Sequence, residues 1–265
     1  MWLKTRIQPL VRLRDRILCA LALGDGPIDK VLILWNETKN ARVRLHLGRY
    51  NPQGVYSLRT LYGTLYFRDN FGDITNLNNI FYRQAYGAGT LSGQGVILDI
   101  GANIGLAAAW FAYHNPMREI FCFEPLSANA AMISLNCPRA RIEQVALGAR
   151  RDKVLLGVDR DSIMASKVPC TWETREQEFD LISLDEFAGA HELNQIRLIK
   201  IDVEGMEAEV LEGGWETLKK TLQLVAETHS RMLHDQVIEH LSYVGFRVDS
   251  ERFKGETGIV FASRE

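Results

Sequence analysis

The sequence predicts an α/β fold built on a mostly parallel sheet with helices on both faces. Two observations carry this prediction. From Val96 onwards, short apolar runs alternate with segments of helical periodicity, which is the pattern of repeated strand–helix–strand units. Between the first run and the first helical segment lies a glycine turn, GANIG (101–105), typical of a ligand-binding crossover. Such units join parallel strands through right-handed crossovers, and the helices then cover the sheet.

Each element of this fold has its own signal. Strands are expected where short apolar runs end at polar or turn residues, and helices where apolar residues recur every three or four positions. In chain order, strands are expected at residues 96–100, 120–123, 142–147, 196–202 and 222–227, with closing strands at 246–250 and 257–262. Helices are expected at residues 104–114, 126–136 and 206–220, and a further one passes through Ile238 and Leu241.

A less regular segment precedes these strands. The residues ARVRLHL (41–47) alternate polar and apolar side chains like a half-buried strand, and residues 55–70 predict two short strands around Gly63. We therefore divide the chain into an N-terminal extension, residues 1–90, and a ligand-binding domain, residues 91–265. The chain has 265 residues, of which 46% are hydrophobic and 24% charged, and this is ample material for one large core.

Net charge and cysteine content exclude several classes of protein. The formal net charge is -2, so no overall basic field favours a nucleic acid as the partner. The cysteines are far apart and form no Cys-x-x-Cys pair, which argues against a zinc site and for a reducing compartment. We expect buried thiols in a cytoplasmic protein, and these are Cys19, Cys122, Cys137 and Cys170.

The N-terminus predicts an amphipathic helix. It begins at Pro9 and ends at Gly24, with apolar residues at helical spacing between them: Leu10, Leu13, Ile17 and Leu21. The apolar run is far too short to span a bilayer. Residues 1–16 carry five basic side chains against one acid, so one interpretation is a peripheral contact with the anionic inner face of the membrane. The other, which such stripes favour, is that the helix packs on its own domain.

The glycine turn at residues 101–105 raises the question of its ligand. A dinucleotide fingerprint needs a glycine between Gly101 and Gly105 where this chain has Asn103, and a phosphate loop needs a lysine that is absent here. Asp99 at the strand end would repel a phosphate but attract an ammonium or a sulfonium. S-adenosylmethionine carries both cations and no phosphate, and it is therefore the expected cofactor.

The next strand ends in a second acid. Glu124 follows the apolar run IFCF, and Pro125 stops the strand there. An acid at this place accepts hydrogen bonds from ribose hydroxyls, in NAD and S-adenosylmethionine alike. Two alternatives to a methyltransferase stay open: an NAD-dependent oxidoreductase, which Asn103 and Asp99 disfavour, and a non-catalytic cofactor-binding or scaffold protein of the same fold.

Six segments occur in the order and spacing of the FkbM-type S-adenosylmethionine-dependent methyltransferases: VILDIGANIGLA, FCFEPLSANAAMISLN, VALG, LISLDEF, LIKIDVEGMEAEVLEGG and LVAETHS. The chain resembles this family over roughly residues 60–262. The resemblance implies a class I methyltransferase fold, a Rossmann-like sheet of seven strands whose last strand runs antiparallel. It also implies O-methylation of a hydroxyl on a sugar, a glycan or glycolipid, or a polyketide-like natural product.

The resemblance assigns roles to individual residues. Asp99, Gly101, Asn103 and Gly105 match the family's cofactor loop, and Glu124 matches its ribose-binding acid.

A segment before the domain, RDNFGDITNLNNIF, resembles the substrate-side segment of polysaccharide-associated members of the family. Arg68 and Asp73 match that segment. Gly72 departs from it, because those members more often carry Ser or Thr there.

Methyl transfer to an alcohol requires alignment of oxygen, methyl carbon and sulfur, and removal of the hydroxyl proton by a general base or by an acidifying metal. Ligands of such sheets lie outside the carboxyl ends of the strands, so side chains at those ends are the candidates. Asp202 and Glu204 follow one strand. Glu227 and His229 end the next one, two residues apart and therefore on the same side.

These four side chains are the catalytic candidates. Asp202, with Lys200 as its partner, is expected to anchor a metal or to orient the acceptor hydroxyl, and His229 is the expected base. Asp202, Glu204 and Glu227 together predict an Mg²⁺ or Mn²⁺ site of oxygen ligands. The other acids of MEAEVLEGG predict a solvated helix face. Acceptor identity, hydroxyl position and oligomeric state stay open.

Overall fold

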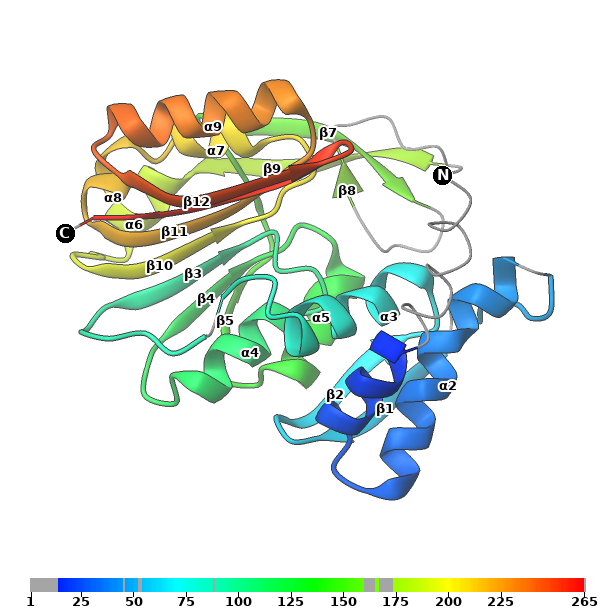
Figure 1. Ribbon diagram of the computed structural model, residues 1–265. Helices are drawn as coiled ribbons and strands as arrows, with labels where there is room; N and C mark the ends of the chain where they lie inside the picture. Colours follow the sequence, from blue (N-terminus) through cyan, green and yellow to red (C-terminus); the bar gives the residue numbers. More distant parts are fainter. Residues whose placement is uncertain are drawn as a thin grey trace, which may run out of the picture. The chain divides into compact units, whose positions relative to one another are not determined.

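The computed structural model describes residues 14–264 apart from residues 45, 52–53, 88, 160–164 and 167–173. The chain forms two compact units, Met1–Ala88 (unit 1) and Gly89–Glu265 (unit 2). Figure 1 shows the elements of each unit.

A seven-stranded sheet forms the centre of unit 2 (Figure 1). In spatial order its strands are β12 (Arg247–Lys254), β13 (Thr257–Ser263), β11 (Thr221–Thr228), β10 (Ile196–Ile201), β3 (Val96–Ile100), β4 (Ile120–Phe123) and β5 (Arg141–Glu143). Neighbouring strands from β11 to β5 run parallel, whereas β13 runs antiparallel to both β11 and β12. The order confirms the predicted seven-stranded, mostly parallel sheet with an antiparallel last strand.

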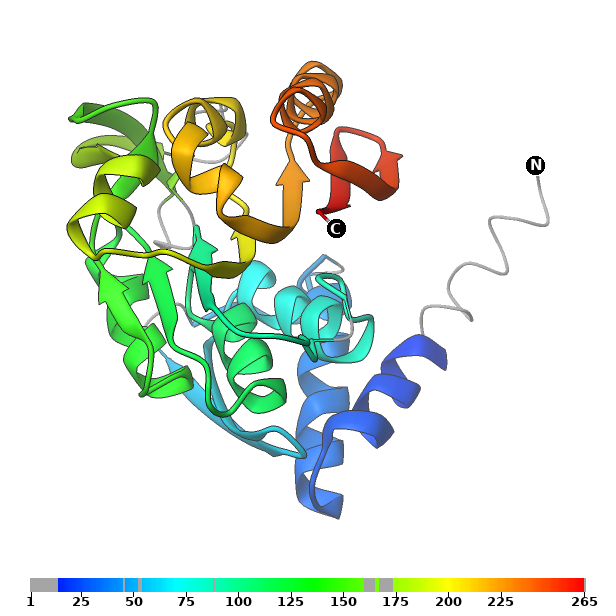
Figure 2. The ribbon, with the colours of Figure 1, turned by 90° about the vertical axis from the view of Figure 1, so that its left-hand side faces the viewer.

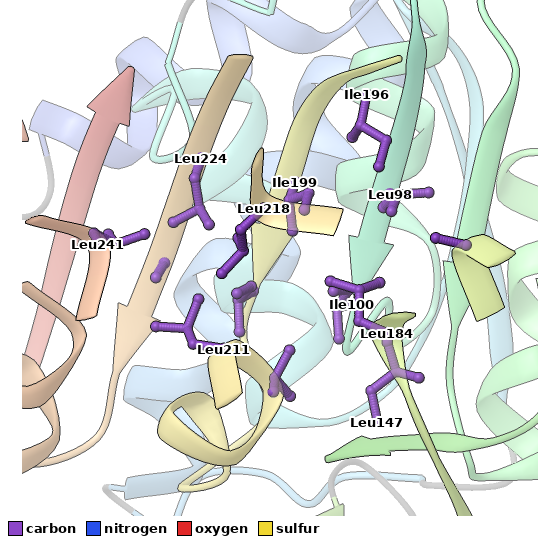
Figure 3. Packing of buried hydrophobic residues seen from close by; sticks show 14 of the residues in the cluster. Leu98, Ile100, Leu147, Leu184, Ile196, Ile199, Leu211, Leu218, Leu224 and Leu241 are labelled. Atoms are coloured by element: carbon purple, nitrogen blue, oxygen red, sulfur yellow. The ribbon is translucent and has the colours of Figure 1, made fainter. Parts of the chain in front are cut away.

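Helices cover both faces of this sheet, as predicted (Figure 1, Figure 2). One face carries α4 (Leu106–His114) and α5 (Ser127–Asn136), and the other carries α6 (Leu184–Ala190), α7 (Glu207–Glu212), α8 (Trp215–Lys219) and α9 (Arg231–Tyr243). Figure 3 shows the apolar layer under the second group, which includes Leu211, Leu218 and Leu241 of the helices and Ile199 and Leu224 of the strands. Because both faces are buried, the central strands β3, β4 and β10 consist mostly of apolar residues.

Unit 2 also contains a four-stranded sheet that the sequence does not predict. Its order is β6 (Ala146–Gly148), β9 (Thr174–Ser183), β7 (Asp152–Asp159) and β8 (Ala165–Ser166). The predicted strand at 142–147 is therefore divided between β5 and β6. β7 and β9 form a long antiparallel pair whose strands carry many charged side chains, and so they lack the apolar run that marks a buried strand.

The predicted helix at 206–220 is two helices, α7 and α8, separated by Gly213 and Gly214. A Cβ atom at Gly213 would lie 2.0 Å from the carbonyl oxygen of Gly148. The close approach of β6 therefore requires glycine at this point, and the helix is interrupted there.

Unit 1 contains a helix at residues 14–23, α2 (Pro27–Arg44), the hairpin β1 (Val55–Thr60) and β2 (Gly63–Arg68), α3 (Phe71–Leu77) and the short π-helix η1 (Asn78–Tyr82). The hairpin confirms the two short strands predicted around Gly63. The predicted strand at 41–47 is wrong, because residues 41–44 form the last turn of α2. Extending an existing helix adds one hydrogen bond per residue, and Ala41 and Arg42 are strong helix formers.

The predicted N-terminal helix lies partly outside the described residues, which begin at residue 14. The described part is helical to residue 23 and buries Cys19, Ala20 and Leu23. The predicted stripe is not the buried face, because Ile17 and Leu21 are 40% and 57% exposed. In the described part of the chain, none of the helices has the length and apolarity needed to cross a membrane.

The cysteines follow the sequence prediction where the structure describes them. Cys19, Cys122 and Cys137 are buried free thiols, and Cys170 lies outside the described residues.

Candidate active site

A pocket opens at the carboxyl ends of β3, β4 and β10. It encloses about 590 Å³ of space free of protein atoms, counting the part open to solvent. Its polar lining comes from Asn103, Glu124, Asn129, Asp202 and Glu204. Its apolar lining includes Phe123, Pro125, Leu147, Leu156 and Met206.

The glycine loop is shaped by its packing against β10. A Cβ atom at Gly101 would lie 1.8 Å from the carbonyl oxygen of Asp202, and φ at Gly101 is +73°, so only glycine fits there. Asn103 has φ 50°, a left-handed conformation that asparagine tolerates better than most residues. Gly105 also has a left-handed backbone conformation, and a Cβ atom there would lie 3.0 Å from the Cα atom of Ile133 in α5. The loop is therefore held at the ends of two neighbouring strands.

Glu124 fastens this loop to the end of β4. Its Oε2 accepts a hydrogen bond from the Asn103 N–H (2.8 Å), and its Oε1 accepts one from the Leu126 N–H (3.0 Å). The side chain is 4% exposed, and burial raises the pKa of Glu124 to about 7 against the opposing effect of these hydrogen bonds. The Asn129 side chain is a further hydrogen-bond partner of this carboxylate.

Asp99 does not lie where the sequence argument places it. Asp99 on β3 and Lys200 on β10 face each other in register, and Asp99 Oδ1 lies 3.1 Å from Lys200 Nζ. Asp99 has no exposed surface and does not line the pocket. The Lys200 ammonium also donates to the Gly101 carbonyl at 2.6 Å. Asp99 thus neutralises a lysine that holds the loop, and its predicted role toward the cofactor's cationic end stays a prediction.

The ends of β10 and β11 bring three predicted residues together. His229 Nε2 lies 3.2 Å from Glu204 Oε2 and 3.7 Å from Asp202 Oδ1. Asp202 Oδ2 is also 3.7 Å from Lys200 Nζ, the predicted partner. Glu204 has φ 52°, a strained conformation for a residue other than glycine, and such strain is concentrated at functional sites.

Glu207 is a residue of this cluster that the sequence analysis missed. The sequence predicts that Glu207 lies on a helix face exposed to solvent, but its side chain is fully buried. Its Oε1 accepts hydrogen bonds from His229 Nδ1 (2.8 Å) and from the Gly205 N–H (3.0 Å). The sequence did contain a signal, because Glu207 precedes the buried Val210 and Leu211 by three and four residues and therefore shares their helix face.

Charges around His229 set the protonation of the cluster. Burial lowers the pKa of His229, but the hydrogen bond to Glu207 and the charges of Asp202 and Glu204 outweigh it and raise the pKa to about 10. Burial and the neighbouring Asp202 raise the pKa of Glu204 to about 7, although His229 opposes the shift. Near neutral pH, His229 is therefore a cation, and Glu204 is the group that titrates.

Glu227 is not part of the close group of candidate metal ligands, although its charge acts on Glu204 and Lys200. Among the described residues, the group whose ligand atoms all lie within 4.8 Å of one another is Asp202, Glu204 and His229. The geometry thus replaces Glu227 by His229 in the candidate metal site.

The match to known protein families completes this description. Residues 99–248, more than half of the chain, match the methyltransferase FkbM domain. The chain belongs to the FkbM methyltransferase family. The matched FkbM domain contains the last two residues of β3, the whole of β4, β10 and β11, and every residue of the pocket and cluster described above.

One relative of this FkbM chain is the 2-O-methyltransferase NoeI of Sinorhizobium fredii (strain NBRC 101917 / NGR234). The two are 30% identical over 159 residues, which are 53% of this chain and 65% of NoeI, so the chain spans slightly less than two thirds of that relative.

Two solved structures are among those similar to this chain. One is the ribosomal protein L11 methylase of Lactobacillus delbrueckii subsp. bulgaricus (10% identity, TM-score 0.44, 74% of this chain and 81% of that one). The other is Aeropyrum pernix fibrillarin with natively bound S-adenosyl-L-methionine (12% identity, TM-score 0.42, 63% and 66%). At this distance, nothing about substrate or mechanism follows from either.

Arg68 and Asp73, the predicted substrate residues, lie in unit 1 and outside the matched FkbM domain. Both are buried. Arg68 Nε lies 3.0 Å from Asp73 Oδ2, Arg68 Nη2 lies 3.1 Å from Oδ1, and the Arg68 N–H also donates to Oδ2. This two-pronged pair joins the end of β2 to the first turn of α3, and its role toward a substrate stays a prediction.

Proposed function

We propose that this FkbM-family chain is an S-adenosylmethionine-dependent O-methyltransferase that acts on a hydroxylated small molecule or glycan. The observation that carries the proposal is the pocket itself: a buried carboxylate, Glu124, lies on one side, and acidic groups at the end of β10 lie on the other. When bound, S-adenosylmethionine supplies an electrophilic methyl group on a sulfonium.

The residues of the pocket fit the parts of this cofactor. Glu124 is placed to accept hydrogen bonds from the ribose hydroxyls, and the side-chain oxygen of Asn103, buried without a hydrogen-bond partner, offers a further acceptor. The apolar lining, which includes Leu147 and Leu156, suits the flat adenine ring. Asp202 is the acid that we assign to the cationic end of the cofactor.

Local charge supports a cationic ligand. The carboxyl groups of Asp99, Asp202, Glu204 and Glu207 outnumber the basic groups of Lys200 and His229 by two. An excess of negative charge in a partly buried site attracts a sulfonium and an ammonium and repels a pyrophosphate. This favours S-adenosylmethionine over NAD.

The proton of the acceptor hydroxyl needs a base, and Glu204 is the better candidate. Its pKa near 7 makes it half ionised at neutral pH, which is the condition for efficient general base catalysis. His229 is already protonated there and has no capacity to accept a proton. In this proposal His229 is a charge partner for Glu204, and Glu207 fixes the imidazole through Nδ1.

A divalent metal is the second version of this chemistry. Two carboxylates and an imidazole nitrogen within 4.8 Å, with the other imidazole nitrogen on Glu207, resemble the ligand and outer-shell arrangement of metal sites. Asp202, Glu204 and His229 would hold Mn²⁺ or Mg²⁺, and the ion would acidify the acceptor hydroxyl. Activity lost to a chelator and restored by either ion supports this version, whereas indifference to chelator leaves Glu204 as the base.

The family and its relative support a choice of acceptor class. NoeI is named a 2-O-methyltransferase, which supports a hydroxyl group as the site of methylation. We assign a sugar, glycan or glycolipid hydroxyl as the first choice and a polyketide-like product as the second. Mass spectrometry of glycans and lipids from cells with and without the gene would show a 14-dalton difference on the acceptor, about one CH₂ group.

Calorimetry tests the cofactor directly. The purified chain should bind S-adenosylmethionine and its demethylated product, and it should not bind NAD. Binding of NAD alone would support the oxidoreductase alternative. Cofactor binding without formation of demethylated cofactor in the presence of the identified acceptor would support the scaffold alternative.

A further inference from the structure

The outer face of α2 in unit 1 is apolar although it is exposed. Ile28, Val31, Leu32 and Trp35 are 69%, 66%, 40% and 59% exposed. They are spaced at i, i+3, i+4 and i+7 and therefore form one stripe along the helix. A different face of α2 packs against unit 1, since Asp29 and Ile33 are buried. We call these four residues the α2 stripe.

The preceding helix repeats the pattern. Ile17, Leu18 and Leu21 are 40%, 37% and 57% exposed, while Cys19, Ala20 and Leu23 are buried. Two consecutive helices thus each have a buried face and a second, exposed apolar face. Scattered exposed apolar residues are ordinary, but a regular stripe on successive helices marks an interaction surface.

The charge around the α2 stripe is strongly basic. Residues 1–51 contain ten Lys or Arg and four Asp or Glu, a net charge of +6, and since the whole chain has -2, the remaining residues carry -8. Two of the four acids are already engaged: Asp29 is buried and lies 3.3 Å from Arg59, and Asp15 lies 3.6 Å from Arg83. Among the basic residues Lys39 is paired with Asp69, and the segment keeps a basic excess after these pairs are counted.

Arg42 extends the stripe with a cation. It follows Trp35 by seven residues, so it lies on the same helix face, and its guanidinium carbon is 3.4 Å from the centroid of the Trp35 ring. Tryptophan and basic side chains beside an apolar stripe are the composition of helices that lie at a membrane surface, where the ring occupies the headgroup level.

We propose that unit 1 docks on an anionic lipid bilayer through the α2 stripe and its flanking basic residues. The apolar side chains enter the boundary between headgroups and acyl chains, and the basic side chains contact anionic headgroups. A second copy of the chain is a poorer occupant, because two such surfaces with the same positive excess would repel each other. If the proposed function holds, the surface would keep the enzyme beside a membrane-attached acceptor.

Vesicle flotation of the full chain tests this surface. The chain should float with vesicles of phosphatidylcholine and phosphatidylglycerol, should bind pure phosphatidylcholine much less, and should be released by salt. The variant Val31→Glu/Trp35→Glu should lower the bound fraction by roughly tenfold or more, because it places two acids in the stripe.

The matched control is Met117→Glu/Tyr243→Glu in unit 2. These side chains are 94% and 79% exposed, so the control makes the same change of charge at exposed apolar positions and should bind vesicles like the unchanged chain. Circular dichroism establishes that both variants are folded.

Three results would overturn the proposal. The unchanged chain fails to float with anionic vesicles; or the stripe variant floats as well as the control; or light scattering shows a dimer that the stripe variant converts to a monomer, which would assign the stripe to a second copy. Deletion of residues 1–13 tests the contribution of this segment separately from that of the α2 stripe. Full loss of vesicle binding in the deletion, with no loss in the stripe variant, would also contradict the proposal.

Discussion

Two buried carboxylates of the site are neutralised in different ways, and this decides what each can do. Asp99 faces a lysine across the sheet, so its charge is matched inside the protein. Glu124 is held by main-chain N–H groups, which leave the carboxylate without a matching cation. The Glu124 carboxylate is therefore available to a ligand, whereas the Asp99 carboxylate stabilises the fold around Lys200.

The Glu124 carboxylate should therefore contribute directly to cofactor affinity. Glu124→Ala is expected to weaken S-adenosylmethionine binding by roughly 1.5–3 kcal/mol, since charge-assisted hydrogen bonds are lost and the Asn103 N–H loses its acceptor. Titration calorimetry measures this. Glu143→Ala, at the end of the adjacent strand and outside the pocket lining, is the control and should bind normally. Unchanged affinity in a folded Glu124→Ala variant would remove Glu124 from the site.

Glu204 should carry the pH dependence of turnover. Glu204→Gln is expected to lower kcat by about 10²-fold or more, as for loss of a general base, with cofactor affinity little changed. In the unchanged enzyme the rate should rise with pH through about 7, because the base must be deprotonated. A rate that is flat between pH 6 and 8 would argue against Glu204.

Glu207 acts through His229, and its role can be measured in the titration of the His229 imidazole. Glu207→Gln should move the imidazole titration of His229 downward from about 10, as followed by nuclear magnetic resonance of the ring, because a charged acceptor at Nδ1 is lost. Glu212→Gln, exposed on the same helix, should leave the titration in place. An unmoved titration in Glu207→Gln would contradict the positioning role.

At the scale of elements, the junction of β2 and α3 depends on the Arg68–Asp73 pair. Asp73→Asn leaves the buried guanidinium without its carboxylate and should lower the free energy of unfolding of unit 1 by about 3–5 kcal/mol in urea denaturation. Asp25→Asn, at an exposed acid of the same unit, should have little effect. Retained stability in Asp73→Asn, with weaker binding of an identified acceptor, would instead favour the substrate role.

The elements that the sequence predicts well are those whose burial is uniform. β3, β4 and β10 are mostly apolar because helices cover both faces, and a run of that kind needs no tertiary information to be recognised. The sequence does not predict β7 and β9, because their many charged side chains obscure the alternation of apolar and polar residues that marks a strand. The end of α2 was misread because four residues of alternation resemble a strand when the preceding helix is not taken into account.

The site was predictable to the same extent. Asp202, Glu204 and His229 follow buried strands, and parallel strands bring their carboxyl ends to one edge. The pairing of Asp99 with Lys200 depends on the register between β3 and β10, which are 100 residues apart, and no local pattern specifies it. The same holds for the contact of Glu207 with His229.

At the scale of the whole molecule, the shifted pKa values predict how stability varies with pH. The folded pKa of Glu124 and Glu204 lies above the ordinary value, so the folded state holds protons that the unfolded state has released, and it loses stability as pH rises to about 7. The raised pKa of His229 adds stability that is complete below its ordinary value of 6.5 and is lost as pH rises toward 10.

Both effects have the same direction, so the melting temperature without cofactor should fall steadily from pH 6 to pH 10. Differential scanning calorimetry measures it. In His229→Gln the decline between pH 8 and pH 10 should become shallower. A melting temperature that rises over this range would contradict the assigned protonation states.

The place of β13 in the sheet has a consequence for solubility. β13 lies between β11 and β12. The seven residues Thr257–Ser263 therefore form backbone hydrogen bonds with two strands at once. Without them, the buried and apolar β11 would present an open row of N–H and C=O groups beside a detached β12. An apolar strand with a free edge is a template for intermolecular pairing. The segment 257–263 does not line the pocket, and we expect that it protects the enzyme from self-aggregation.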